Sequence, residues 1–254
     1  MKYYVTADVH GFYSIMRSAL EDVGYFTDQE PHRLLVLGDL FDRGEEAKKM
    51  QEFILDLMEK DEVILIRGNH EDLFEEFVIK DDGRSYAHHR SNGTYSTALQ
   101  LTGFDPEIAR REHHRLAILS QQTPYYKRII PATRDYYETE NYVFVHGWIP
   151  RSIDGSEYYE FDPDWRTADL IRWEKARWIN GIRAARFTKE KKTIVCGHWH
   201  TSFGHAFYED KGSEDGPDAD FSPYYAPGII AIDACTAFSK KVNVIVIEDN
   251  EMPA

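Results

Sequence analysis

The sequence predicts an α/β fold in which parallel strands alternate with helices. Short β-rich apolar runs alternate with amphipathic segments through the first eighty residues, and similar apolar runs return later in the chain. The 254 residues, 42% of them hydrophobic, are enough to bury a large core. We therefore expect a single domain over residues 1–254.

The first part of the chain contains three strand-like runs, each followed by a helical pattern. The strand-like runs cover residues 3–8, 33–39 and 62–69, and the helical patterns cover residues 13–24, 45–60 and 71–80. The second helical pattern has one apolar stripe at helical spacing, formed by Met50, Phe53, Ile54, Leu57 and Met58. This alternation is typical of parallel βαβ units.

The middle of the chain, from about residue 81 to 137, loses this rhythm. It carries the turn signals DDG, SNG and TGFDP and a helical pattern around residues 106–120. We predict a mostly helical excursion over the sheet. Its tyrosines are expected to pack on the sheet in preference to lining a cap over a substrate; they are Tyr86, Tyr95, Tyr125, Tyr126, Tyr136 and Tyr137.

The later part of the chain returns to β-like runs. They cover residues 142–147, 193–198, 228–234 and 241–249, which brings the total to seven candidate strands, enough for two stacked sheets. The acidic, turn-rich stretch 209–223 lies among them. We predict that this stretch is a mobile surface loop and not a metal site.

Composition excludes several classes of function. The formal net charge of −14 argues against electrostatic binding to nucleic acid or an anionic membrane, and the longest apolar runs are too short to span a bilayer. The opening residues MKYYVTADVH leave no room for a secretion signal. Cys196 and Cys235 lie in β-like runs and are expected to be buried free thiols. We expect a soluble cytoplasmic protein.

Five of the predicted strands end in side chains that commonly bind metals. The tips carry Asp8 and His10, then Asp39, then Asn69, His70 and Glu71, then His146, and finally His198 and His200. A lone Asp at such a tip is usually a helix N-cap, and a lone His is usually a rim residue. Ligands of parallel α/β sheets gather beyond the carboxyl ends of the strands, however, and so much buried charge without an ion would be costly. The five tips together favour a metal site.

The types of ligand narrow the choice of metal. Carboxylate oxygen, amide oxygen and imidazole, without a thiolate at the tips, suit Mn²⁺ best in our interpretation, with iron or zinc as alternatives. One ion cannot use so many ligands. Two ions about 3.5–4 Å apart and bridged by a carboxylate could use them, and such a pair serves hydrolysis at phosphorus.

The motifs TADVHG, GDLFDRG, RGNHE, HG and GHWH resemble, in this order and spacing, the calcineurin-like metallophosphoesterases. GDLFDRG with RGNHE resembles more narrowly their phosphoprotein phosphatase branch, which includes small bacterial and phage members. The resemblance extends from Asp8 to His200, and the segment IDACTAF is a weaker match. It implies a four-layer α/β/β/α sandwich, here with a mostly helical insertion.

The resemblance also implies a ligand set for each ion. The first ion would be held by Asp8, His10, Asp39 and His200. The second would be held by Asp39, Asn69, His146 and His198, so that Asp39 is the bridge. The extra histidine of GHWH is common in the wider superfamily but unusual in the phosphoprotein phosphatase branch. We expect both His198 and His200 to face the metal edge, because residues two apart in an extended tip point to the same side.

By the same resemblance, His70 paired with Asp42 protonates the leaving oxygen, and a carboxylate on one ring nitrogen fixes the tautomer of an imidazole. Arg43 should grip the phosphoryl oxygens with its planar guanidinium. A second phosphate clamp is expected from DLIRWEKARWING, which offers Arg172 and Arg177, and we prefer Arg177. The expected phosphate-binding set is Arg43, Asn69, His70 and Arg177.

The leading hypothesis is a two-metal phosphatase acting on phosphate monoesters, such as phosphoserine or phosphothreonine, in which a metal-bridging hydroxide attacks phosphorus directly. The same motifs would also suit a hydrolase of dinucleoside polyphosphates, similar to a symmetric diadenosine tetraphosphatase. A third hypothesis, a non-catalytic metal-binding scaffold, is opposed by the intact His70 and Asp42, because a scaffold needs at most the metals. The expected partner is a phosphorylated protein or a small phosphate ester.

Overall fold

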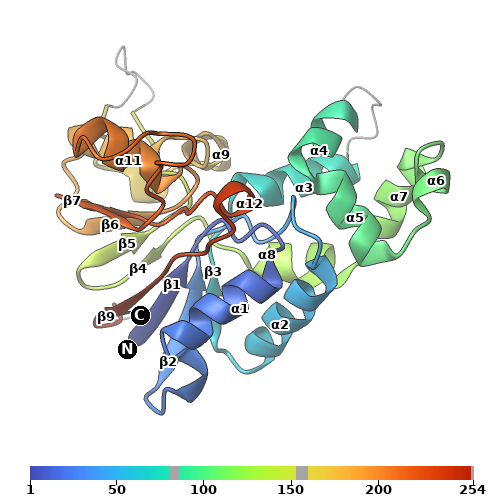
Figure 1. The fold of residues 1–254 in the computed structure, drawn as a ribbon, viewed down its shortest axis with the longest axis horizontal. Coiled ribbons are helices and arrows are strands. Elements are labelled where there is room, and N and C mark those ends of the chain that lie inside the picture. Colours follow the sequence, from blue (N-terminus) through green and yellow to red (C-terminus); the bar gives the residue numbers. More distant parts are fainter. Residues whose placement is uncertain (80–85, 153–159, 253–254) are drawn as a thin grey trace.

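The computed structural model describes residues 1–79, 86–152 and 160–252. Over these residues the chain forms two β-sheets that stack in the middle of the molecule, with helices on both outer sides (Figure 1). The predicted four-layer α/β/β/α arrangement is confirmed. The first three strands and the last strand of the chain form one sheet, and the strands between them form the other.

The first sheet has the strand order β3-β2-β1-β9. The three strands β1 (Lys2–Thr6), β2 (His32–Val36) and β3 (Val63–Leu65) run parallel. The last strand of the chain, β9 (Val244–Glu248), pairs antiparallel with β1, with Val5 opposite Ile245. All four strands were predicted from the sequence.

The second sheet has the strand order β4-β5-β6-β8-β7. Its centre is parallel and consists of β5 (Tyr142–Phe144), β6 (Thr193–Cys196) and β8 (Ile229–Ala231). Its edges are the short antiparallel strands β4 (Tyr137–Glu138) and β7 (Tyr224–Ala226). The sequence did not predict these two edge strands, because they lie outside the apolar runs on which the other strands were predicted.

Helices follow the central strands of each sheet. The first sheet is followed by α1 (Tyr13–Asp22), α2 (Ala47–Glu59) and α3 (Asn69–Ile79). The second is accompanied by α9 (Leu170–Ala176), α10 (Gly181–Ala184), α11 (Thr201–Tyr208) and α12 (Thr236–Ser239). Short 3-10 turns cover Tyr25–Thr27, Trp165–Thr167 and Ala185–Phe187. No helix among the described residues is long and apolar enough to cross a membrane.

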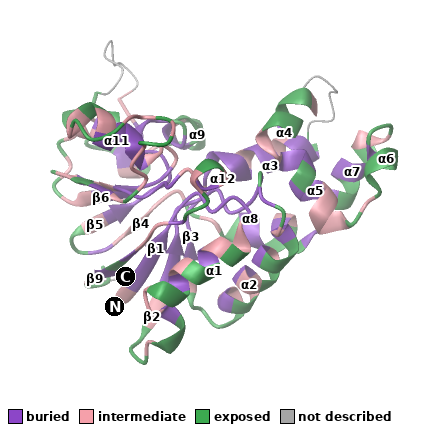
Figure 2. Cartoon of the chain, viewed as in Figure 1, coloured by how far each residue is buried: buried purple, intermediate pink, exposed green. Residues whose placement is uncertain are grey.

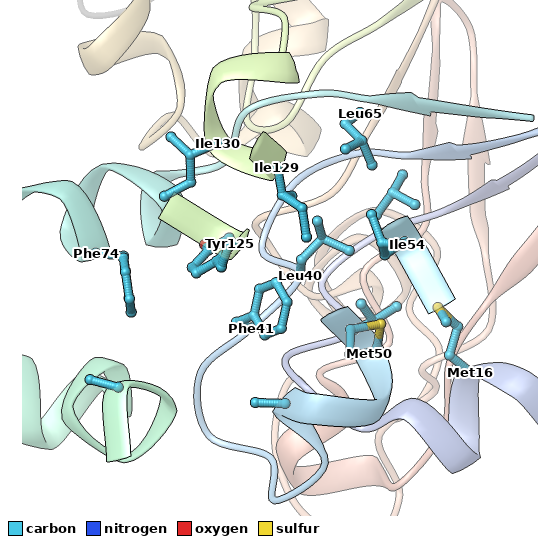
Figure 3. Close-up of a cluster of buried hydrophobic side chains, with 14 of the residues drawn as sticks. Met16, Leu40, Phe41, Met50, Ile54, Leu65, Phe74, Tyr125, Ile129 and Ile130 are labelled. Atoms are coloured by element: carbon cyan, nitrogen blue, oxygen red, sulfur yellow. The ribbon is translucent and has the colours of Figure 1, made fainter. Parts of the chain in front are cut away.

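The central strand β1 is buried on both faces, and its successive residues point to opposite sides. Tyr3 and Val5 pack with Phe144 and Val195 of the other sheet, so they fill the space between the sheets. Tyr4 and its neighbours instead pack under the helices of the first sheet. Figure 3 shows part of this second cluster, including Met16, Met50 and Ile54. This apolar support fixes the strand ends that carry the polar residues.

The helical insertion projects from the body of the molecule at the side of α3 (Figure 1). It contains α4 (Tyr86–Asn92), α5 (Thr94–Thr102), α6 (Pro106–Ala109) and α7 (His113–Ser120), then the π-helix Tyr125–Ile129 and α8 (Ile130–Ala132). The mostly helical character predicted for residues 81–137 is confirmed, apart from residues 81–85, which lie outside the described residues. Figure 2 shows that α4 and α6 expose much of their surface.

One smaller expectation is partly corrected, and the mobility predicted for residues 209–223 stays a prediction. Cys196 is buried in β6, but Cys235 is only half-buried and precedes α12 in a left-handed conformation, so it is not a strand residue. Both thiols are free. The stretch 209–223 contacts the body through backbone oxygens of Glu214 and Phe221, which accept hydrogen bonds from Ser202 and Asn243.

Candidate metal centre

The loops that follow β1 and β2 are joined by backbone hydrogen bonds. The backbone N–H of His10 donates to the carbonyl of Asp39 at 2.9 Å, and that of Gly11 donates to the carbonyl of Leu40 at 2.8 Å. Asp8, His10 and Asp39 all have left-handed backbones, with φ of 52°, 48° and 52°. Such conformations are costly for residues with a β-carbon and cluster at functional sites. The loops of β1 and β2 therefore hold each other in an unusual shape.

Two glycines allow the carboxylates to come close to neighbouring backbone. A β-carbon at Gly68 would lie 2.2 Å from Oδ1 of Asp39, and one at Gly197 would lie 2.1 Å from Oδ2 of Asp8. Neither space could hold a methyl group. Gly68 and Gly197 immediately precede Asn69 and His198, so the glycines of GNHE and GHWH are required by the packing of the site.

Asp39 lies between two groups of potential ligands. Its Oδ2 is 3.8 Å from Nε2 of His10 and 3.9 Å from Nε2 of His70, whereas its Oδ1 is 3.4 Å from Nε2 of His146. Among the described residues, two groups have ligand atoms within 4.8 Å of one another: His10, Asp39 and His70, and Asp39, His146 and His198. Asp39 belongs to both, as a bridging ligand would.

Hydrogen bonds set the tautomers of two of these histidines. Nδ1 of His10 donates to the carbonyl of Phe41 at 3.0 Å, and Nδ1 of His146 donates to the carbonyl of Leu37 at 2.7 Å. Each Nε2 then carries a lone pair that faces its cluster, as in metal-binding histidines. Oδ1 of Asn69 lies 2.8 Å from Nε2 of His146. Two lone pairs directed at one point suit a shared cation.

The protonation states agree with ligand roles. Burial lowers the pKa of His10 and of His146, and it lowers the pKa of His198 to about 3, so the three rings are neutral near pH 7. Burial alone would raise the pKa of Asp39, but His146, His70 and His10, which carry charge at the acid pH where Asp39 titrates, outweigh it and leave the pKa below its usual value. A carboxylate among neutral imidazoles is the donor set of a divalent ion.

Asp8 and Asp233 add two further buried acids. Oδ2 of Asp8 accepts the backbone N–H of His198 at 2.9 Å. Burial and the nearby Asp233 and Asp39 raise the pKa of Asp8, and burial raises the pKa of Asp233 to about 7. Sequence reasoning missed Asp233, although it follows β8 as Asp8 and Asp39 follow β1 and β2. Three clustered acids that repel one another would be stabilised by cations.

Glu71 is a second residue that sequence reasoning left without a role. Its carboxylate is fully buried and accepts backbone N–H groups of Asp39 at 3.0 Å, Leu40 at 3.1 Å and Gly68 at 2.8 Å. The hydroxyl of Tyr125 also donates to it at 3.2 Å. Glu71 thus ties the loop after β2 to the loop after β3. Only its place in GNHED marked it, and no pattern in the sequence shows these contacts.

His70 and Asp42 form the expected pair. Nδ1 of His70 donates to Oδ2 of Asp42 at 2.7 Å, and both side chains are buried. Burial lowers the pKa of His70, but the charges of Asp39 and Asp42 outweigh it and raise the pKa above its usual value. Arg43 is exposed, and its guanidinium donates to Nε2 of His10 at 3.0 Å and lies 3.2 Å from Nε2 of His70. Arg43 therefore covers the first cluster from the solvent side.

His200 differs from its expected place. Its Nδ1 is 2.7 Å from the hydroxyl of Ser202 in α11, and its Nε2 is 3.7 Å from Glu214 in the stretch 209–223, so neither ring nitrogen is directed at the two clusters. The alternation rule fails here because His198 is left-handed, with φ of 64°, and the chain turns before it enters α11. The structure thus gives no support to His200 as a ligand.

The expected second phosphate clamp also differs. The guanidinium of Arg177 is buried and forms ion pairs with Asp72 at 2.7 Å and Asp135 at 2.5 Å. Arg172 forms an ion pair with Asp162 and donates to the carbonyl of Arg151. Both arginines are thus bound to carboxylates of the protein, and neither is retained here as a phosphate ligand.

Comparisons with known proteins place the chain in a family and identify similar folds. A family model described as calcineurin-like phosphoesterase matches residues 1–226. The solved cold-active protein tyrosine phosphatase of a psychrophilic Shewanella species is 18% identical, with a TM-score of 0.58 over 98% of this chain and 76% of that chain. A protein serine/threonine phosphatase from Saccharomyces cerevisiae is 14% identical, with a TM-score of 0.51 over 100% and 81%. No curated protein matches the sequence.

Proposed function

Because the chain belongs to the calcineurin-like phosphoesterase family, a family of metal-dependent phosphoric ester hydrolases, we propose that it hydrolyses phosphate monoesters at a site with two divalent ions. The observation that carries this proposal is the position of Asp39, which is shared by two clusters of potential ligands and lies 3.9 Å from His70, the ring that Arg43 contacts. Ligands for two ions, an acid and a phosphate-binding cation meet within one edge of the fold.

Each side chain has a part in this reaction. Asp39, His10, His146, His198 and Asn69 would hold the ions, together with Asp8. Arg43 would bind two phosphoryl oxygens and offset their negative charge. His70, oriented by Asp42, would give its proton to the leaving oxygen. Asn69 and His70 would also contact the phosphate. When bound, a pair of such ions supplies Lewis acidity and an activated water.

The metal pair that we propose first is Mn²⁺, with iron or zinc as alternatives. Carboxylate and amide oxygens make up part of the donor set, and the described ligand groups contain no thiolate. Oxygen ligands suit manganese, while the imidazoles also suit iron and zinc. We further propose a cytoplasmic location, for which the two free thiols are the supporting observation.

A groove beside Asn69 favours a monoester over a polyphosphate substrate. It measures about 330 Å³ and is lined by Asn69, Leu73, Ile79 and Trp178 and by the acids Asp72, Glu75, Glu76 and Glu174. Arg67 forms ion pairs with Asp72 and Glu75, and Arg177 pairs with Asp72, yet acids still outnumber these cations. A dinucleoside polyphosphate would bring several negative charges to this lining, and like charges repel.

The same groove suits a peptide. Half of the Trp178 surface is exposed, its ring lies 5.7 Å from that of His198, and Ile79 is exposed nearby. Apolar and aromatic groups next to a metal ligand can contact the chain that carries the phosphate. We therefore propose a phosphoprotein as the physiological substrate in preference to a dinucleotide.

The test is a substrate screen with the manganese-loaded full chain. It should compare phosphoserine, phosphothreonine and phosphotyrosine peptides with an aryl phosphate and with diadenosine tetraphosphate. We expect the highest kcat/KM for a phosphopeptide and no activity in Asp39→Asn. Preference for diadenosine tetraphosphate would identify a dinucleoside polyphosphate hydrolase. Metal and phosphate binding without turnover of any ester would identify a non-catalytic scaffold.

A further inference from the structure

We propose that Thr94 and Thr97, from helix α5 of the insertion, are positioning residues that hold the carboxylate of Asp42 in the orientation His70 requires. The inference rests on the proposed function, in which His70 protonates the leaving oxygen. It gives the helical insertion a part in the chemistry, although the insertion lies outside every motif that marks the metal centre.

Three donors surround the carboxylate of Asp42. The hydroxyl of Thr97 donates to Oδ1 at 2.7 Å, and the hydroxyl of Thr94 donates to Oδ2 at 2.8 Å. Oδ2 also accepts from Nδ1 of His70 at 2.7 Å. Thr94 and Thr97 are fully buried and Asp42 is 1% exposed, so water does not compete for these hydrogen bonds.

Thr97 also holds the backbone of Asp42. The backbone N–H of Asp42 donates to the hydroxyl oxygen of Thr97 at 3.0 Å, so this hydroxyl donates and accepts at the same residue. Asp42 and Arg43 are left-handed, with φ of 75° and 66°. A backbone N–H that donates to a buried hydroxyl supports a turn that a residue with a β-carbon rarely adopts.

The start of α5 lies directly against this turn. A β-carbon at Gly93 would lie 2.3 Å from the backbone nitrogen of Arg43. The close approach brings Thr94, the first residue of α5, and Thr97, one turn later, to the same side of the helix. Gly93, Thr94 and Thr97 therefore act on the Asp42–Arg43 turn as one unit.

The physical consequence concerns the plane of the carboxylate. The last torsion of an aspartate is soft and roughly two-fold, so a single partner does not fix the plane. Donors on both oxygens do fix it, and they leave Oδ2 directed at Nδ1 of His70. Through that bond the carboxylate sets the ring orientation, and hence the position of Nε2, from which the proton would leave.

The kinetic test uses substitutions that keep shape and remove the hydroxyl. Thr97→Val should lower kcat for an alkyl phosphate about tenfold, with KM unchanged. This loss is smaller than the about 10²–10⁴-fold that a general acid contributes, because His70 itself remains. The loss should nearly vanish for an activated aryl phosphate, whose leaving group needs no proton. Thr97→Ser should restore kcat, because it keeps the hydroxyl. Thr94→Val should show the same pattern and serves if Thr97→Val does not fold.

A matched control lies on the same helix. The hydroxyl of Thr102 donates to the carbonyl of Ala98 at 2.7 Å, within α5. Thr102→Val therefore removes a hydroxyl from α5 without touching Asp42, and it should leave kcat unchanged for both substrates. Equal losses for alkyl and aryl substrates in Thr97→Val, or an equal loss in Thr102→Val, would overturn the inference.

A second readout needs no turnover. In the zinc-loaded full chain with ¹⁵N-labelled histidine, the Nδ1 proton of His70 should resonate far downfield and exchange slowly with water. Thr97→Val should speed this exchange, and Thr97→Ser and Thr102→Val should not. An unchanged signal in Thr97→Val overturns the positioning role. If the wild type hydrolyses no phosphate ester, the proposed function fails, yet the NMR result still decides whether the threonines hold Asp42.

Discussion

The loops after the first sheet and the loops after the second sheet build the metal centre in different ways. The loops after β1, β2 and β3 bind one another, through the backbone of His10 and Asp39 and through Glu71. The loops after β5 and β6 instead reach across to the first sheet. His146 donates to the carbonyl of Leu37, and the N–H of His198 donates to Asp8.

The two clusters therefore differ in whether their residues come from one sheet or from both. His10, Asp39 and His70 all come from the first sheet and the helix that follows β3, whereas the other cluster adds His146 and His198 of the second sheet to Asp39. The first cluster is local to one sheet, and the second lies across the seam between the sheets. An ion in the second cluster would hold the sheets together, and an ion in the first would not.

The largest effect is expected from Asp39→Asn, which acts on both clusters. Both ions should bind much more weakly, and turnover should fall by about 10³-fold or more, because metal stabilisation of transition-state charge amounts to several kcal/mol. Elemental analysis after dialysis and an aryl phosphate assay measure the two effects. The exposed Asp56→Asn on α2 is the control. Loss of one ion alone would contradict the shared position of Asp39.

The next largest effect should come from His70→Asn, which tests whether the first cluster includes His70 as a ligand or as an acid. As an acid, its loss should lower turnover by about 10²–10⁴-fold for alkyl phosphates and less for activated aryl phosphates. Both ions should remain, which elemental analysis shows. A stoichiometry of one ion would instead make His70 a ligand of the first ion.

A smaller, contrasting pair of effects is expected from His146→Ala and His10→Ala. Each should remove one ion. His146→Ala should also loosen the seam, since its ring binds Leu37 across the sheets. Hydrogen exchange at Phe144 and Val195, between the sheets, should speed more in His146→Ala than in His10→Ala. Equal exchange rates in both variants would contradict the proposal that the second cluster joins the two sheets.

Mn²⁺ at a concentration of about 100 Kd should stabilise the wild type against unfolding by about 2.7 kcal/mol per site.

The smallest effect is expected from His200→Ala. Because its ring faces Ser202 and Glu214, the variant should retain two ions and turnover within about twofold of the wild type, as expected for a substitution away from the site. Metal titration measures this directly. Selective loss of one ion would restore His200 as a ligand. The first cluster would then also join residues of both sheets.

The sequence predicted most of the fold and most of the residues that the structure brings together in the two candidate ligand clusters, and the departures have physical causes. The seven predicted strands and the polar residues at their ends depend on local patterns, which a sequence displays. His200 was misplaced because one left-handed residue, His198, reverses the alternation on which the prediction relied. Arg177 was misjudged because its partners Asp72 and Asp135 are distant in sequence. Thr94, Thr97 and Glu71 act through tertiary contacts that no motif records. The single domain stays a prediction.

The left-handed residues of the candidate metal centre lower the stability of the fold, and the proposed activity requires their side chains. Asp8, His10, Asp39, Asp42 and His198 each adopt a positive φ, which costs of order 1–3 kcal/mol for residues other than glycine. Glycine or asparagine at these positions would relieve the cost and remove the chemistry. Selection of variants for thermal stability alone should therefore enrich asparagine or glycine at positions 8, 39 and 42, while selection that also demands turnover should keep the aspartates.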